Sequence, residues 1–138
     1  MADNNKSTLL AAVDFSSFSK EAVMFAAKLA DEIEAKIIVL HVIHDPAESP
    51  GFYAKKKKKK KILQNIEDAA TDMMDDFIAG LQKEMPKSKS LSNAETLLVI
   101  GTPVKRIIEV AKKKNVRMIF LAIALSPSSN EHCTARTK

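Results

Sequence analysis

The sequence predicts a single α/β domain over residues 1–138, built on an open, doubly wound parallel sheet. Three observations support this prediction. Short apolar segments alternate with amphipathic ones along most of the chain. The first of them follow in the order strand, helix, strand, which is the order of a βαβ unit, and such a crossover makes its two strands parallel. A length of 138 residues is enough for one domain of this class.

The first crossover unit follows a polar tail at residues 1–7 and begins with a short, continuous apolar run, the pattern of a strand that both faces of a sheet cover. Asp14, Ser16 and Ser17 come next, and their side-chain oxygens suit the start of a helix. Apolar side chains then recur at helical spacing, and a run rich in β-branched residues completes the unit. The two strands are predicted at residues 8–13 and 36–43.

The second half of the chain repeats this alternation. A stretch containing prolines and a glycine predicts a loop, and the seven consecutive lysines that follow are assigned to the same loop, over residues 45–61. A long amphipathic helix then ends before Pro86, and residues 87–93 form a Ser/Lys linker. Thr102 and Pro103 mark the start of another helix. The third and fourth strands are predicted at residues 95–100 and 116–125.

The chain changes character after the fourth predicted strand. Residues 126–138 are polar and show no apolar periodicity, so the C-terminal helix and the fifth strand of such a sheet are missing from the prediction. The apolar fourth strand then lies near a sheet edge, where unpaired backbone groups invite pairing with another chain. We therefore expect residues 116–125 to be covered by a partner chain or by swapped structure.

The charge is concentrated in one segment. The net charge is +5, but removing Lys55 to Lys61 takes it to −2. A block of like charges is typical of a solvated loop, whereas binding of nucleic acid or acidic lipid is the less favoured interpretation. One tyrosine and no tryptophan offer no stacking platform for bases. We therefore expect no nucleic-acid partner.

The predicted compartment is the cytoplasm. No apolar run approaches the about 20 residues that cross a bilayer, so no membrane association is expected. The first residues contain no apolar core of a signal peptide. Cys133 is the single cysteine, so it cannot form an internal disulfide or a zinc site alone.

Two stretches resemble the universal stress protein family. The first contains VDFS at 13–16 and LHVI at 40–43, and the second contains GTP at 101–103 and MIFL at 118–121. Together they span residues 8–123. The resemblance implies an adenine nucleotide alpha hydrolase-like fold of five parallel strands, often dimeric through the last strand. Some members of this family bind ATP and others do not.

The resemblance also implies a ligand site. By position, Asp14 and Val42 match the adenine and ribose contacts of the family, beyond the carboxyl ends of the strands. The phosphate-binding glycines do not carry over, because the matching positions hold Ala122, Leu125, Ala135 and Arg136. Glycine lets backbone amides approach phosphates, and Leu125 blocks that approach. Standard ATP binding is therefore not expected, and ATP or AMP stays open as a cofactor.

The residues themselves leave other roles open. Asp14 either contacts a ligand or caps a helix, and Val42 either contacts a ligand or belongs to the core. His41 and His44 lie on opposite faces of a strand, so no metal site is predicted. The serines after the first strand have no histidine with an orienting acid nearby, so no catalytic residues are predicted.

These observations predict a non-enzymatic module of the stress response that acts as a homodimer or with protein clients, without standard ATP binding. The alternative is an adenine-nucleotide-binding stress regulator that takes ATP or AMP and keeps the half of the site at Asp14 and Val42.

Overall fold

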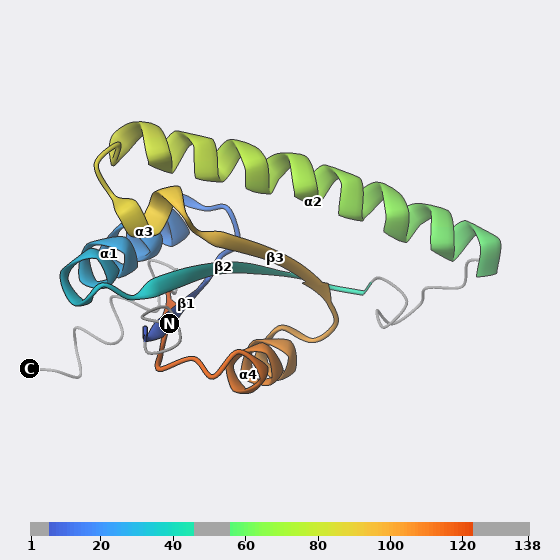
Figure 1. The fold of residues 1–138 in the computed structure, drawn as a ribbon. Helices are drawn as coiled ribbons and strands as arrows, with labels where there is room; N and C mark the ends of the chain where they lie inside the picture. The colour runs from blue at the N-terminus through green and yellow to red at the C-terminus, as the bar shows by residue number, and fades with distance from the viewer. Residues whose placement is uncertain (1–5, 46–55, 123–138) are drawn as a thin grey trace, which may run out of the picture.

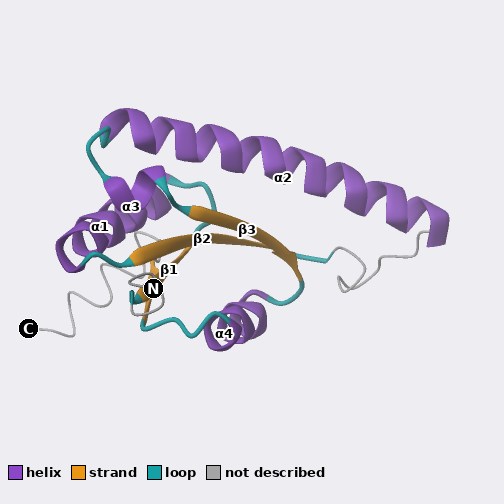
Figure 2. Cartoon of the chain, in the orientation of Figure 1, coloured by secondary structure: helices purple, strands orange, loops and turns teal. Residues whose placement is uncertain are grey.

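The computed structural model describes residues 6–45 and 56–122, and these residues form one α/β domain (Figures 1 and 2). Side chains are described throughout these ranges except at 56–59. The elements follow in the order β1 (Thr8–Ala12), α1 (Ser17–Ile33), β2 (Lys36–Ile43), α2 (Lys56–Glu84), α3 (Lys89–Ser92), β3 (Glu95–Ile100), α4 (Pro103–Lys113) and β4 (Met118–Leu121).

The sheet has four parallel strands in the order β3-β2-β1-β4. Helices α1, α2 and α3 cover one face, and α4 covers the other (Figure 1). The chain therefore starts at a central strand, builds outward to β3, and returns across the second face to place β4 on the far side of β1. This arrangement confirms the predicted open, doubly wound sheet.

The core lies in two layers because alternate residues of a strand point to opposite faces. Ala11 and Val39 pack against α1, α2 and α3, together with Met74 of α2. Leu10 and Leu40 point the other way and pack against α4. Both leucines are fully buried, and removing the side chain of such a residue down to alanine costs about 2–5 kcal/mol.

Local chemistry fixes both ends of α1. Ser16 is the N-cap, and its hydroxyl accepts a hydrogen bond from the Ser19 amide at 3.2 Å. At the other end, Glu34 adopts the left-handed conformation with φ 57° and donates its amide to the carbonyl of Ala30. A left-handed C-cap usually carries glycine, so the fold holds Glu34 in a conformation that its Cβ disfavours.

The predicted loop over 45–61 is wrong for residues 56–61, which form the first turns of α2. Lysine is a good helix former, and each like-charged pair one turn apart costs only about 0.2–0.5 kcal/mol. The later turns of α2 are anchored by Met74 and Leu81, which are 2% and 1% exposed. Since extending an existing helix adds one hydrogen bond per residue, the helix continues into the lysine segment despite the repulsion.

Other boundaries also differ from the sequence prediction. β1 ends at Ala12, one residue earlier than predicted. The linker over 87–93 contains the short helix α3, whose N-cap Ser88 accepts a hydrogen bond from the Leu91 amide at 3.2 Å. β4 begins at Met118, two residues later than predicted. The predicted polar tail over 126–138 and the expected lack of a further helix and strand lie outside the described residues.

The helices of the part of the chain that the structure describes were compared with the requirements of a membrane span. None of its helices combines the length and the apolar character that a crossing requires.

Candidate functional site

The predicted site lies at the carboxyl ends of β2, β1 and β4, which are neighbours in the sheet. The chain builds outward from β1 in both directions, so the switch point of this sheet falls between β1 and β4. Asp14 follows β1 after one further residue, Val42 lies near the end of β2, and Ala122 directly follows β4. The fold therefore brings the three predicted positions to one edge of the sheet, on three adjacent strands.

Asp14 is the centre of a local hydrogen-bond network. Its Oδ1 accepts hydrogen bonds from the Ser19 hydroxyl at 2.6 Å and from the Ser16 amide at 3.0 Å. The Ser19 oxygen in turn accepts the Asp14 amide at 2.9 Å. Hydrogen bonds from the side chains of Ser16 and Ser19, and from the Ser16 amide, lower the pKa of Asp14 from 3.8 to about 2. Asp14 is therefore an exposed carboxylate with a structural role at the start of α1.

An aromatic cluster begins at the next residue. Phe15 follows Asp14 and adopts a left-handed backbone conformation with φ 66°. Its ring centroid lies 4.4 Å from that of His41 and 5.7 Å from that of Phe77 on α2. His41 Nδ1 lies 2.7 Å from the carbonyl oxygen of Val13, and because a carbonyl only accepts, His41 donates from Nδ1. Sequence reasoning missed this cluster, although Phe15 and His41 both stand in the motifs that it used.

Val42 and Ala122 are the other two predicted positions at this edge. The side chain of Val42 packs against the cluster on the α4 face, on the side of the sheet away from Phe15 and His41. It is thus part of the core, which leaves its backbone as the group available at the strand end. Ala122, which the family resemblance matches to the first phosphate position, is half-buried. Leu125, Ala135 and Arg136 lie outside the described residues.

The described residues were compared with the ligand groups that a metal ion requires. Across residues 6–45 and 56–122, no three His, Cys, Asp or Glu side chains come together in a group that could hold an ion. His41 is half-buried against Phe15, while His44 is exposed beyond the end of β2. His132 and Cys133 lie outside the described residues.

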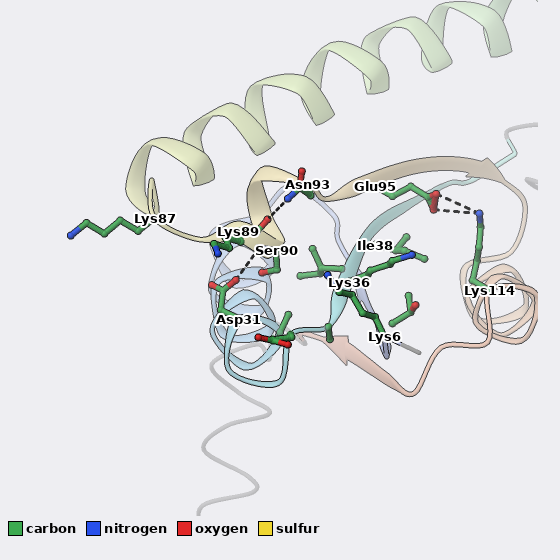
Figure 3. Close-up of a pocket in the computed structure, with 15 residues that line it drawn as sticks. Lys6, Asp31, Lys36, Ile38, Lys87, Lys89, Ser90, Asn93, Glu95 and Lys114 are labelled. Carbon is green, nitrogen blue, oxygen red and sulfur yellow. Dashed lines mark hydrogen bonds and ion pairs between the residues drawn. The ribbon is translucent and has the colours of Figure 1, made fainter. Parts of the chain in front are cut away.

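A hollow of about 1010 Å³ lies at the opposite edge of the sheet, by the amino ends of the strands (Figure 3). One wall carries Asp31, which accepts hydrogen bonds from the Ser88 hydroxyl at 2.7 Å and the Ser90 amide at 2.9 Å. Burial raises the pKa of Asp31, but the bonds from these two serines outweigh it and lower the pKa overall. The other wall carries the ion pair between Glu95 and Lys114, 3.4 Å apart.

Two of the lysines around this hollow are directed elsewhere. Five of its lining residues are lysines, but Lys114 is paired with Glu95, and the side chain of Lys87 points away from the hollow in Figure 3. Asp31 joins α1 to the start of α3, and the ion pair of Glu95 with Lys114 joins β3 to the end of α4, so these polar groups have structural partners. The carboxyl edge with Asp14 therefore remains the better candidate for a functional site.

Fold and site together define a class: an open, doubly wound α/β domain with a polar loop beyond the carboxyl ends of its strands, as in the adenine nucleotide alpha hydrolase-like proteins. The model of the universal stress protein family matches residues 7–123, and the chain belongs to this family.

Solved structures agree with this assignment at the level of the fold. The universal stress protein UspA from Lactobacillus plantarum is similar with a TM-score of 0.66 and 22% identity, over 88% of this chain and 81% of that one. A universal stress family protein from Burkholderia pseudomallei has a TM-score of 0.63 and 18% identity, over 96% and 90% of the two chains. No curated protein matches this chain.

Proposed function

We propose that this chain is a non-enzymatic module of the stress response that acts through protein contacts, as a homodimer or with protein clients, and that lacks standard ATP binding. Membership of the universal stress protein family supports the stress-response part of this proposal. The observation that supports the lack of standard ATP binding is the set of hydrogen bonds that Asp14 already makes. Its Oδ1 already holds Ser16 and Ser19 in the cap of α1, and Ala122 stands at the first phosphate position.

The same network supports the absence of catalysis. Among the described serines, the Ser19 hydroxyl lies closest to a carboxylate, but Ser19 is only 2% exposed. The Ser19 hydroxyl donates its hydrogen bond to the Asp14 carboxylate at 2.6 Å, and no histidine lies between the two groups to make the oxygen nucleophilic. His41 Nδ1 donates to the Val13 carbonyl and does not face the serine through that atom.

Isothermal titration calorimetry with ATP and with AMP tests the proposal. We expect no saturable binding heat at ligand concentrations up to about 100 μM, which corresponds to a loss of at least about 2.8 kcal/mol of binding free energy relative to a micromolar site. A micromolar Kd for ATP would contradict it.

A second candidate function is favoured by the aromatic cluster at Asp14. An adenine-nucleotide-binding regulator would use the exposed carboxylate for a ribose or adenine donor and the ring of Phe15 as an apolar wall. Asp14→Asn should then weaken AMP binding at least about tenfold, because it removes the charge from the acceptor. Asp31→Asn is the matched control, since Asp31 also accepts bonds from two serines but lies at the opposite edge. Equal AMP affinity in both variants would reject this candidate.

A further inference from the structure

Opposite charges are segregated along α2. Residues 56–61 are all lysines and open the helix, whereas the acidic residues follow later, at Glu67, Asp68, Asp72, Asp75 and Asp76. Residues 62–82 contain no lysine or arginine. Because the first acid comes six residues after the last lysine, no lysine of this run has an acid three or four residues further on, which is the spacing of an ion pair within a helix. The two charge blocks of α2 are therefore not paired along the helix.

The charges of α2 also lack ion-pair partners in the rest of the described domain. Within residues 6–45 and 56–122, neither Lys60 nor Lys61 nor any of the five acids takes part in an ion pair. The lysines moreover lie at the amino end of the helix, where the helix dipole favours anions. A second helix with the same charge pattern, running in the opposite direction, would bring acids to these lysines and lysines to these acids.

An apolar row runs along one flank of the same helix. Ile62, Ile66, Ala69 and Met73 follow each other at steps of four, three and four residues, which is the spacing of a coiled-coil seam. Met73 is 50% exposed, Ala69 is exposed, and the two isoleucines are half-buried. Met74, which packs in the core, lies on the neighbouring stripe of the helix. We call the flank formed by these four residues the α2 seam.

Much of the α2 seam lies on a part of the helix that extends past the sheet. α2 has 29 residues and is about 43 Å long, whereas the eight residues of β2 span about 26 Å. Figure 1 shows the first turns of α2 reaching beyond the ends of β2 and β3. Ala70 is the first of the described side chains of α2 that is buried. The amino-terminal half of α2 is therefore accessible to a partner.

A second copy of α2 matches the seam in one antiparallel register. A two-fold axis midway between Ile66 and Ala69 places Ile66 opposite the partner's Ala69 and Ile62 opposite the partner's Met73. The same two contacts are repeated on the other side of the axis, so all four seam residues of each copy gain an apolar partner. In a coiled coil such contacts fix the register of the two helices.

This register also makes the charges complementary. Lys61 comes level with the midpoint between the partner's Asp72 and Asp76, and all three residues are exposed. Asp76 continues the spacing of the seam, three residues after Met73, and the position level with it in the other copy is Lys59. The apolar spacing and the charge pattern are independent features of the sequence, and they select the same register.

A polyanion suits this surface less well than a second copy does. Nucleic acid or an acidic lipid surface would attract the lysines at 56–61, but the acids that begin at Glu67 would repel it within two turns of the helix. A polyanion would also leave the α2 seam uncovered. A second copy of α2 accounts for both the charges and the apolar row.

We propose that two copies of this chain associate through α2, as an antiparallel pair of helices joined along the α2 seam. This inference rests on the homodimer of the proposed function and assigns it a surface on the helical layer, away from the edge strands of the sheet. The lysine run is then one half of a self-complementary charge pattern, and the acidic part of α2 is the other half.

The experiment is a charge exchange measured by analytical ultracentrifugation of the full chain at about 0.15 M salt, where exposed charges are screened beyond about 8 Å. We expect the unmodified chain to dimerise at micromolar concentration. K59E/K61E alone or D72K/D76K alone should weaken dimerisation about tenfold or more, because each turns attractions across the axis into repulsions. The variant that combines all four substitutions should restore the dimer.

D68K/D75K is the matched control for this exchange. It changes the charge of α2 by the same amount as D72K/D76K, at two exposed acids of the same helix. At 3.6 residues per turn, Asp68 and Asp75 lie on the flank opposite the α2 seam. The control should therefore leave the dimer unchanged, and circular dichroism of every variant shows that α2 stays folded.

A cross-link tests the register independently of the charges. In a chain carrying Cys133→Ser, the pair of substitutions Ile62→Cys and Met73→Cys should give an intermolecular disulfide under mild oxidation, because the two positions face each other across the axis. Either substitution alone should give none, since the two copies of one position lie about 16 Å apart along the helices, beyond the reach of a disulfide. The same separation prevents a disulfide within one chain.

The outcomes separate this inference from the proposed function. A dimer that ignores the charge exchange and is not cross-linked by the pair at 62 and 73 would overturn the α2 interface and leave the homodimer standing. A monomer up to about 100 μM would overturn both. A chain that stays monomeric but binds a labelled oligonucleotide or anionic vesicles, and loses that binding in K59E/K61E, would overturn the inference and assign the lysines to a polyanion.

Discussion

Removing the hydroxyl of Ser19 tests whether the Asp14 network is structural. Ser19 is 2% exposed, donates to Asp14 Oδ1 at 2.6 Å and accepts the Asp14 amide at 2.9 Å. In Ser19→Ala both bonds are lost. A hydrogen bond to a charged group contributes about 1.5–3 kcal/mol, and the exposure of the Asp14 carboxylate places the expected loss toward the lower end of that range. We expect the free energy of unfolding to fall by about 1–3 kcal/mol at pH 7.

The pH dependence gives a second readout of the same substitution. The network lowers the pKa of Asp14 to about 2 from 3.8, so the folded state binds a proton less readily than the unfolded state. Its stabilising contribution is therefore complete above about pH 4 and is lost as the pH falls toward 2. Without the Ser19 hydroxyl the pKa of Asp14 should rise, and this part of the acid destabilisation should shrink.

Urea denaturation followed by circular dichroism, repeated between pH 5 and pH 2, measures both effects. Ser17→Ala is the control, because Ser17 is exposed and its neighbour Ser16 supplies the N-cap; its change should stay within about 0.5 kcal/mol. A Ser19→Ala chain as stable as the control at pH 7, with an unchanged slope in acid, would refute the structural role of the network.

Four other substitutions have defined outcomes in the same urea assay. Glu34→Gly should stabilise the chain by about 0.5–1 kcal/mol, because Glu34 is held at φ 57°. The control Glu32→Gly, inside α1, should destabilise the chain by about 1 kcal/mol. Stabilisation by both substitutions or by neither would contradict the left-handed cap. Gly101→Ala should cost about 1–3 kcal/mol, since φ is 143° and a Cβ would lie 2.9 Å from Cγ of Arg106, so a neutral result would argue against this backbone conformation. Leu40→Ala should cost about 2–5 kcal/mol, and a smaller loss would show that the cluster against α4 closes around the cavity.

The order of the elements was predictable because each apolar run is long enough to identify by itself. Residues 36–43 and 95–100 are strands over the ranges that the sequence predicts, and Pro103 begins α4 where a proline is best tolerated. In these segments local preference and tertiary packing favour the same structure. Thr102 is also in the predicted N-cap position, although its side chain makes no capping hydrogen bond.

The prediction failed where distant contacts outweigh local preference. Read by itself, the lysine segment suggests an extended, self-repelling loop, but residues 56–61 are helical because α2 is anchored more than a turn away, at Met74 and Leu81. The left-handed conformations of Phe15 and Glu34 could not be predicted either, because a positive φ is uncommon for both residue types. The cluster of Phe15, His41 and Phe77 depends on α2 crossing the end of β2, which no local pattern contains.

The position of Asp14 was predictable from the sequence, whereas the hydrogen bonds of its carboxylate were not. A sequence can place an acid after the first strand, but only the fold shows that Ser19, five residues later, returns its buried hydroxyl to that acid. Oδ1 already accepts bonds from the Ser19 hydroxyl and the Ser16 amide, so a ligand donor that used this oxygen would have to displace one of them. Displacing the Ser19 bond leaves a buried hydroxyl donor without a partner, which costs about 1–3 kcal/mol. A ligand that binds in spite of this cost must either use the other carboxylate oxygen or release the first turn of α1. Destabilisation of the α1 cap on AMP binding, seen as faster amide exchange at Ser19, would therefore distinguish a true ligand site from a helix cap.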